Sequence, residues 1–85
     1  MPETESYYYV YILQCIAEPM HHYTGCTTNL QDRLRRHNSG DVPHTAKFAP
    51  WRIETVIRFS SKEKAHEFER YLKSGSGREF ARRHF

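Results

Sequence analysis

Hydrophobic side chains crowd into residues 7–15, which carry the clearest strand pattern of the chain. β-Branched and aromatic residues fill this segment, and it contains no glycine or proline. The bulky residues fall on both faces of the expected strand, with Tyr8, Val10 and Ile12 on one face and Tyr7, Tyr9, Tyr11 and Leu13 on the other. This pattern predicts a central strand that is covered on both sides.

Two further segments predict strands beside the first one. Residues 17–20 contain a proline and predict a turn, so that residues 22–26 form a hairpin with the first strand. Gly25 within this second strand indicates a bulge or a close approach of the backbone. Residues 51–59 alternate between hydrophobic and polar and predict a half-buried strand, whose expected inward residues are Trp51, Ile53, Ile57 and Phe59.

The first expected helix follows the hairpin. Residues 28–31 match a capping box that opens a helix, and residues 38–40, with their glycine, end it. Leu30 and Leu34 are four residues apart and are expected to face the core. Residues 41–50 contain two prolines and predict a loop.

Two more helices are expected after the third strand. Residues 60–63 form a second capping box and open a helix that runs to about residue 73. The segment that follows is rich in glycine and serine and ends this helix. Ser76 together with Glu79 predicts a cap for a last short helix over residues 78–84.

The element order β-β-α-β-α-α predicts an α+β fold. A small three-stranded antiparallel sheet flanked by helices is the simplest way to bury these elements. Eighty-five residues allow one hydrophobic core and therefore one domain. We expect that domain to cover residues 7–85, and we expect the polar and acidic residues 1–6 to form a disordered tail.

Charge is distributed unevenly along the chain. The net charge is +3, but residues 1–32 contain four acidic residues and no lysine or arginine. Residues 33–85 contain all thirteen lysines and arginines against six acidic residues. A basic surface on part of a small domain favours a partner with a phosphate backbone, and a solvated basic surface without a partner is the alternative.

Cysteine content and hydropathy predict a reduced, cytoplasmic protein. The two cysteines, Cys15 and Cys26, do not make a disulfide framework, and no secretory leader precedes them. The longest hydrophobic run is far too short to span a membrane, so no membrane association is expected. A zinc site from the two cysteines with His21 and His22 is conceivable, but the spacing of these residues matches no common ligand pattern.

Glu69 interrupts the hydrophobic stripe of the second expected helix. Ala65, Phe68 and Leu72 make this stripe, and Glu69 falls within it. A carboxylate that faces the core costs several kcal/mol unless it is paired, protonated or bound to a metal. Two interpretations stay open: a structural ion pair, for example with Arg33, and a metal ligand or general base that lines a cleft.

Four other residues fall where they can join Glu69. Tyr11 and Tyr23 lie on neighbouring expected strands, and Arg33 and His37, four residues apart, share a helix face. These side chains suit the cleavage of phosphodiester bonds. An arginine binds phosphate in a bidentate manner. A Mg²⁺ ion needs only one or two carboxylates, and a histidine or tyrosine can move protons.

The motifs at these positions resemble the GIY-YIG nucleases. The two tripeptides that name the family appear as residues 10–12 (VYI) and 23–25 (YTG), followed by residues 28–30 (TNL). Arg33 and His37 then follow at the family's spacing, and the resemblance extends over residues 7–85 through Ala65, Glu69 and Lys73. The family fold, a small three-stranded sheet flanked by helices, agrees with the predicted element order.

The resemblance also implies roles for individual residues. Tyr11 and Tyr23 would line the active site, where one of them positions or deprotonates the attacking water. Arg33 would bind the scissile phosphate, and His37 would support proton transfer or phosphate binding. Glu69 would hold a single Mg²⁺ or Mn²⁺ ion. The implied substrate is DNA, duplex or branched, with RNA as a second possibility, and DNA repair or recombination is the implied setting.

This sequence departs from the family pattern in four ways. The first tripeptide lacks its glycine, and Cys26 stands where many members have a lysine that assists the base, so the base is left open. No asparagine follows Asn38, although several members use a late one near the metal. Larger members also carry a separate domain for DNA or partner binding. Low sequence specificity is therefore expected, unless a partner protein supplies specificity.

Further basic residues are expected to contact nucleic acid, namely Arg36, His44, Lys47, Lys73 and Arg78. The alternative to a nuclease is a non-catalytic nucleic-acid-binding module, which would use the same basic surface with exposed tyrosines as stacking platforms. A tyrosine acting as a covalent nucleophile was also considered, but nothing in the sequence requires it. Tyr7, Tyr8 and Tyr9 are expected to be structural.

Overall fold

The structure, a computed structural model, describes residues 6–85 and confirms the predicted α+β class. Three antiparallel strands, β1 (Tyr8–Cys15), β2 (His22–Thr27) and β3 (Trp51–Phe59), form one sheet with the order β2-β1-β3. Of the predicted tail, residues 1–5 lie outside the described part, and Ser6 is exposed.

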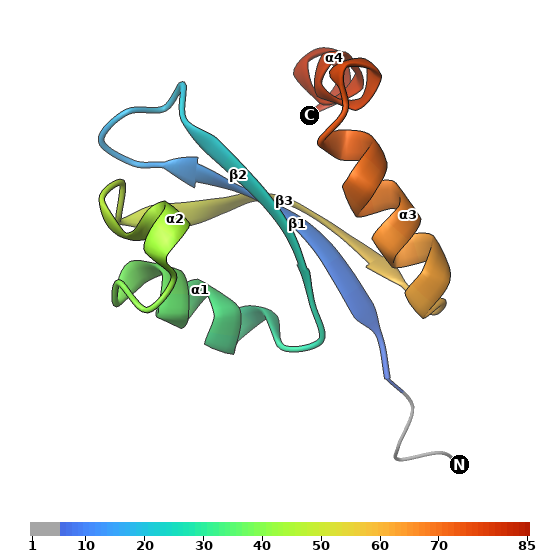
Figure 1. Ribbon diagram of the computed structural model, residues 1–85, viewed down its shortest axis with the longest axis horizontal. Coiled ribbons are helices and arrows are strands. Elements are labelled where there is room, and N and C mark those ends of the chain that lie inside the picture. Colours follow the sequence, from blue (N-terminus) through green and yellow to red (C-terminus); the bar gives the residue numbers. More distant parts are fainter. Residues whose placement is uncertain (1–5) are drawn as a thin grey trace.

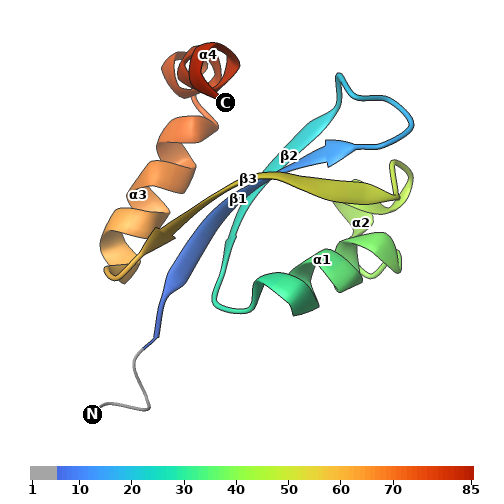
Figure 2. The same ribbon diagram turned by 180° about the vertical axis from the view of Figure 1, so that it is seen from behind.

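Strand β1 is the central strand and is covered on both faces, as predicted. Val10 and Ile12 belong to one hydrophobic cluster, and Tyr11 and Leu13 belong to a second cluster on the opposite face. The helices divide accordingly, with α1 and α2 on one side of the sheet and α3 and α4 on the other (Figures 1 and 2). Strand β2 lies at the edge of the sheet, so side chains from the two faces of the sheet can approach each other around this strand.

The prediction of a single inward face on β3 was wrong. Thr55 lies opposite Ile12 and Ile53 lies opposite Leu13, so one extra residue of β3 bulges out between them. A bulge of one residue moves the following side chains to the other face of the sheet. Trp51, Ile53 and Val56 therefore pack with the Tyr11 cluster, whereas Phe59 packs with the Val10 cluster.

Helix α1 (Leu30–Asn38) begins one residue later than the capping box predicted. Asn29, not Thr28, is the N-cap, and its side-chain oxygen accepts a hydrogen bond from the backbone N–H of Asp32 at 3.0 Å. The expected loop over residues 41–50 contains a short helix, α2 (Pro43–Ala46). Proline at the first position of a helix is favourable, so Pro43 starts α2 and does not only interrupt regular structure.

Helices α3 (Lys62–Leu72) and α4 (Gly75–His84) also begin at caps other than those expected. Ser61 caps α3 in place of Ser60, and Ser74 caps α4 in place of Ser76, so the glycine-rich segment is helical. A Cβ at Gly77 would lie 1.8 Å from the backbone oxygen of Tyr71. A glycine there lets α4 start directly against the end of α3.

Within residues 6–85, no helix is long and hydrophobic enough to cross a membrane. Both cysteines are free, with Cys15 buried and Cys26 half-buried. The sulfur of Cys15 donates a hydrogen bond to the carbonyl oxygen of Phe48, a contact inside the second cluster.

Candidate active site

Tyr11 is the buried centre of the site. It lies on β1 directly opposite Gly25 of β2, and its side chain is 1% exposed. A Cβ at Gly25 would lie only 2.4 Å from the Tyr11 hydroxyl oxygen. The second tripeptide therefore needs its glycine because the tyrosine of the first tripeptide occupies that space.

His37 connects Tyr11 to the short helix α2. The Tyr11 hydroxyl lies 3.0 Å from Nε2 of His37, and Thr45 Oγ1 lies 2.8 Å from Nδ1. The Thr45 hydroxyl donates to the carbonyl oxygen of Val42, so it accepts from the Nδ1–H of His37. This assignment leaves Nε2 unprotonated, and Nε2 accepts the hydrogen of Tyr11.

The two central groups are both neutral near pH 7. Burial raises the pKa of Tyr11 to about 12, although a hydrogen bond and the positive charge of Arg33 act in the opposite direction. Burial also lowers the pKa of His37 below its ordinary value, and the positive charges of Arg33 and Arg36 lower it further. The site therefore contains a tyrosine hydroxyl next to a free imidazole base.

Arg33 lies beside this pair on α1 and is only partly exposed. Among the described residues, no carboxylate lies within ion-pair distance of it, whereas Arg35 and Arg82 are paired with Asp32 and Glu79. An arginine that is unpaired next to a buried hydroxyl is available to an anionic ligand.

Tyr23 closes the other side of the pair. Its ring centroid lies 4.9 Å from that of His37 and 6.5 Å from that of Tyr11. The ammonium of Lys73 lies 5.9 Å from the Tyr23 ring centroid. This contact links the tyrosine on β2 with the end of α3.

Glu69 reaches the site from α3, and its side chain is 20% exposed. Its carboxylate pairs with Lys73 Nζ at 3.0 Å and with His66 Nδ1 at 3.7 Å. The suggested ion pair with Arg33 is therefore not formed, and the Glu69 carboxylate instead contacts Lys73 and His66. The negative charge of Glu69 also acts to raise the pKa of Tyr11.

Glu69 also belongs to a group of side chains that can hold a metal ion. The potential ligand atoms of Cys26, His66 and Glu69 all lie within 4.8 Å of one another. A single carboxylate fits Mg²⁺, which takes its other ligands from water and substrate. The four residues weighed as a zinc site do not form such a group, since Cys15 is buried within the core. Burial, together with the Glu69 charge, raises the pKa of the Cys26 thiol.

The expected nucleic-acid-binding residues fall into two sets. Arg36, His44 and Lys47 are exposed on the side of the sheet that α1 and α2 cover. Lys73 and Arg78 line a groove of about 840 Å³ between the sheet and α4. Both sets are solvent-accessible; the first acts on the site through the charge of Arg36 beside His37, and the second contacts it through Lys73 beside Tyr23.

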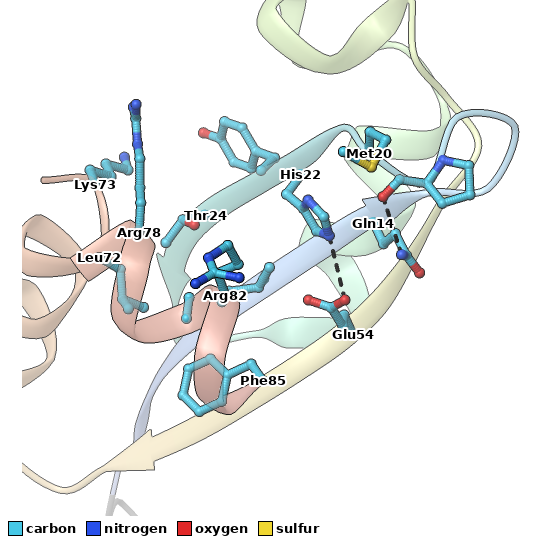
Figure 3. Close-up of a pocket in the computed structure, with 14 residues that line it drawn as sticks. Gln14, Met20, His22, Thr24, Glu54, Leu72, Lys73, Arg78, Arg82 and Phe85 are labelled. Carbon is cyan, nitrogen blue, oxygen red and sulfur yellow. Dashed lines mark hydrogen bonds and ion pairs between the residues drawn. The ribbon is translucent and has the colours of Figure 1, made fainter. Parts of the chain in front are cut away.

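The groove adds further residues to those expected (Figure 3). Arg78 and Arg82 come from α4, and His22 and Glu54, which form an ion pair at 3.4 Å, come from the sheet. Tyr23 and Lys73 belong to the groove as well, whereas Tyr11, Arg33, His37 and Glu69 do not. The groove therefore leads toward the site and does not contain it.

Sequence analysis missed several residues of the site. Thr45 lies in the segment that was expected to be a loop, and Cys26 was considered as a ligand with Cys15, His21 and His22 but not with Glu69. His66 lies three residues before Glu69 on the same helix face, a spacing typical of paired ligands, and this signal was available in the sequence. The partnership of Thr45 with His37 depends on the fold of α2 and had no signal of its own.

Comparison with known proteins agrees with this geometry. Residues 7–82 match the family model of the GIY-YIG catalytic domain. A UPF0213 protein of Natronomonas pharaonis is 37% identical over 68 residues, covering 79% of this chain and 78% of that protein. The solution NMR structure of a UPF0213 protein from Bacillus halodurans is similar, with a TM-score of 0.54 and 35% identity over 89% of this chain and 80% of that chain.

A second kind of relative is a subunit of an endonuclease. The structure-specific endonuclease subunit SLX1 of Debaryomyces hansenii is 41% identical over 73 residues, which is 78% of this chain. This chain spans only 21% of the length of that relative. Nucleases of the GIY-YIG family generally depend on a divalent metal. The chain thus belongs to the GIY-YIG family, whose catalytic domain it matches from residue 7 to residue 82.

Proposed function

We propose that this chain is a metal-dependent DNA endonuclease whose active site lies around the edge strand β2. One observation carries the proposal: the Tyr11–His37 hydrogen bond lies beside Arg33, which forms no ion pair within residues 6–85, and the charge of Glu69 acts on the same tyrosine. Hydrolysis of a phosphodiester bond needs a proton acceptor, a phosphate-binding cation and a metal ligand. These side chains supply each of the three.

Proton transfer is assigned to the Tyr11–His37 pair. The attacking water gives a proton to the Tyr11 oxygen while the Tyr11 hydroxyl proton passes to Nε2 of His37. The hydroxide attacks phosphorus, the bond to the leaving oxygen breaks, and that oxygen takes a proton from solvent. Tyr11 ends neutral and His37 ends as an imidazolium. A tyrosine with a pKa of about 12 can act near neutrality in this way, because it never has to exist as a free anion.

Arg33 and Glu69 act on the phosphate group. Arg33 binds the non-bridging oxygens and stabilises the charge that grows on them as the bond to phosphorus forms. Glu69 would hold a divalent ion, which when bound neutralises charge on the phosphate and the leaving oxygen. Without a metal, the Glu69 carboxylate pairs with Lys73 and contacts His66.

The substrate and setting belong to the same proposal. The groove beside the site is lined by Lys73, Arg78 and Arg82, which suits a DNA backbone, duplex or branched, with RNA as a second substrate to test. We propose low intrinsic sequence specificity, since larger family members use a separate domain for DNA binding. We also propose that a partner protein supplies specificity and that the setting is DNA repair or recombination.

The decisive test is incubation with plasmid, branched DNA and RNA in Mg²⁺, in Mn²⁺ or with a chelator. The proposal expects nicking that the chelator abolishes. Binding of every substrate without cleavage under any metal would instead identify a non-catalytic nucleic-acid-binding module.

Replacing Thr45 with valine tests the proton relay. The valine has a similar shape but accepts no hydrogen bond, so the Nδ1–H of His37 loses its partner and the tautomer is no longer fixed. We expect cleavage to slow by about tenfold, as for a supporting hydrogen bond. The imidazolium also loses an acceptor, so the acidic limb of the pH–rate profile should move to lower pH.

The matched control for this change is Thr45→Ser, which keeps the hydroxyl. It should restore both the rate and the pH profile. A Thr45→Val variant that is slower with an unchanged acidic limb would assign Thr45 a structural role alone.

Replacing Arg78 with glutamine tests the groove. Removing one phosphate contact should weaken DNA binding uniformly across sequences and reduce the slope of log affinity against log salt by about one unit. Arg83→Gln is the control, because Arg83 lies on the same helix but does not line the groove. Equal salt slopes for the two variants in a fluorescence-anisotropy titration would show that DNA does not follow the groove.

A further inference from the structure

We infer that Cys26, His66 and Glu69 form a binding site for a zinc-type divalent ion. The inference rests on the proposed function in one respect, because it concerns the carboxylate that would hold the catalytic ion. It goes beyond that function by adding a thiol and an imidazole as ligands and a different metal preference.

The three side chains come from two elements that pack against each other. Cys26 lies on β2 and faces the cluster that contains Val10, while His66 and Glu69 lie three residues apart on α3. That spacing puts His66 and Glu69 on one helix face, and their facing atoms are already 3.7 Å apart. The fold therefore brings a strand ligand to a pair of helix ligands.

The distances suit a tetrahedral ion after a small adjustment. Ligand atoms at about 2.0–2.3 Å from zinc lie roughly 3.3–3.8 Å from one another. In the structure the three ligand atoms are within 4.8 Å of one another, so the set must contract by about 1 Å. The His66 side chain is 48% exposed and free to make this movement.

The chemistry of the three ligands selects the metal. Thiolate sulfur and imidazole nitrogen favour zinc and similar transition metals, whereas Mg²⁺ requires oxygen ligands in an octahedron. Three protein ligands also leave one tetrahedral position open, as in catalytic zinc sites. An ion in this site would displace Lys73 from Glu69 and exclude Mg²⁺ from the same carboxylate.

A purely structural explanation makes different predictions. In that case His66 and Lys73 would only neutralise Glu69 as exposed ion pairs, and Cys26 would only pack against the Val10 cluster. Neither role requires the sulfur to bind a metal. A probe that reports on metal–sulfur bonds therefore separates the two explanations.

The experiment is a titration of the full chain with Co²⁺, followed by absorption spectroscopy and competition with Zn²⁺ and Mg²⁺. We expect a thiolate-to-cobalt charge-transfer band, d–d bands typical of tetrahedral Co²⁺, stoichiometric displacement by Zn²⁺ and no displacement by excess Mg²⁺. Cys26→Ser should remove the charge-transfer band even though Cys15 is still present. His66→Ala should weaken Co²⁺ binding by at least about tenfold, since even an outer-shell partner contributes that much.

His21→Ala is the matched control for His66→Ala. His21 is 45% exposed and pairs with Glu18 three residues before it, but it lies outside the ligand group. This variant should bind Co²⁺ like the unchanged chain. The inference is overturned if no charge-transfer band forms, if the band survives in Cys26→Ser, or if His21→Ala and His66→Ala weaken binding equally.

Failure of the metal site and failure of the proposed nuclease activity give different results. Cobalt binding through Cys26 in a chain that cuts no nucleic acid would overturn the proposed function and support the metal site. Cleavage in Mg²⁺ by a chain that gives no cobalt–thiolate band would overturn the metal site and support the proposed function.

Discussion

Changing Glu69 to glutamine is expected to lower the rate of DNA cleavage by about 100-fold to 1000-fold. Glutamine has nearly the same shape but carries no charge, so it cannot neutralise and hold a divalent ion. The packing of the neighbouring stripe residues Ala65, Phe68 and Leu72 should be unaffected. Lys73 loses its partner, but this side chain is 49% exposed and the cost to stability is small.

The control for this change is Glu67→Gln on the same helix. Glu67 is exposed and makes no ion pair among residues 6–85. It should cleave like the unchanged chain at every Mg²⁺ concentration. If Glu69→Gln cleaves within a few-fold of Glu67→Gln at saturating Mg²⁺, Glu69 is not the metal ligand and its role is the ion pair with Lys73 and His66.

Changing Tyr11 to phenylalanine is expected to slow cleavage by about 100-fold or more. The ring keeps its packing within the hydrophobic cluster of Leu13 and Trp51. The hydroxyl that donates to Nε2 of His37 is lost. The change in cleavage rate is measured by single-turnover kinetics in a plasmid-nicking assay. Tyr8→Phe is the control, because Tyr8 packs on the opposite face of the sheet.

Alkaline unfolding checks the same residue independently of activity. Burial raises the pKa of Tyr11 from 10.0 in the unfolded chain to about 12 in the folded chain. Its contribution to stability is therefore complete below pH 10 and falls as the pH rises toward 12. The loss should amount to roughly 3 kcal/mol. Tyr11→Phe should lack this loss, and an identical alkaline decrease in urea unfolding would contradict the burial of a neutral hydroxyl.

Much of the fold could be predicted because local patterns and packing agree. Residues 7–15 carry bulk on both faces, and the sheet indeed covers both faces of β1. The bulge in β3 could not be predicted, since residues 51–59 alternate regularly and only pairing with β1 shows that one residue is extra. The observed helix starts differ from the predicted ones by one to three residues, because more than one residue near each start can serve as the N-cap.

For the candidate site, the sequence suggested a set of side chains but not the contacts that each one makes. Glu69 was proposed from its place in a hydrophobic stripe, and its negative charge acts to raise the pKa of the buried Tyr11. The partners of Glu69 were not anticipated, because Lys73 and His66 on the same helix are closer than Arg33. The contact between Thr45 and His37 arises only when α2 folds back onto α1.

The most direct test of the central claim compares two arginines of the same helix. Arg33 and Arg35 both lie on α1, but Arg35 is exposed and paired with Asp32, whereas Arg33 lies beside Tyr11. The measurement is the rate of plasmid nicking in Mg²⁺ by the unchanged chain, Arg33→Ala and Arg35→Ala. We predict that Arg35→Ala nicks like the unchanged chain and that Arg33→Ala is slower by about 100-fold or more. Equal rates for the two variants, or no nicking by the unchanged chain, would contradict an active site around Tyr11 and Arg33.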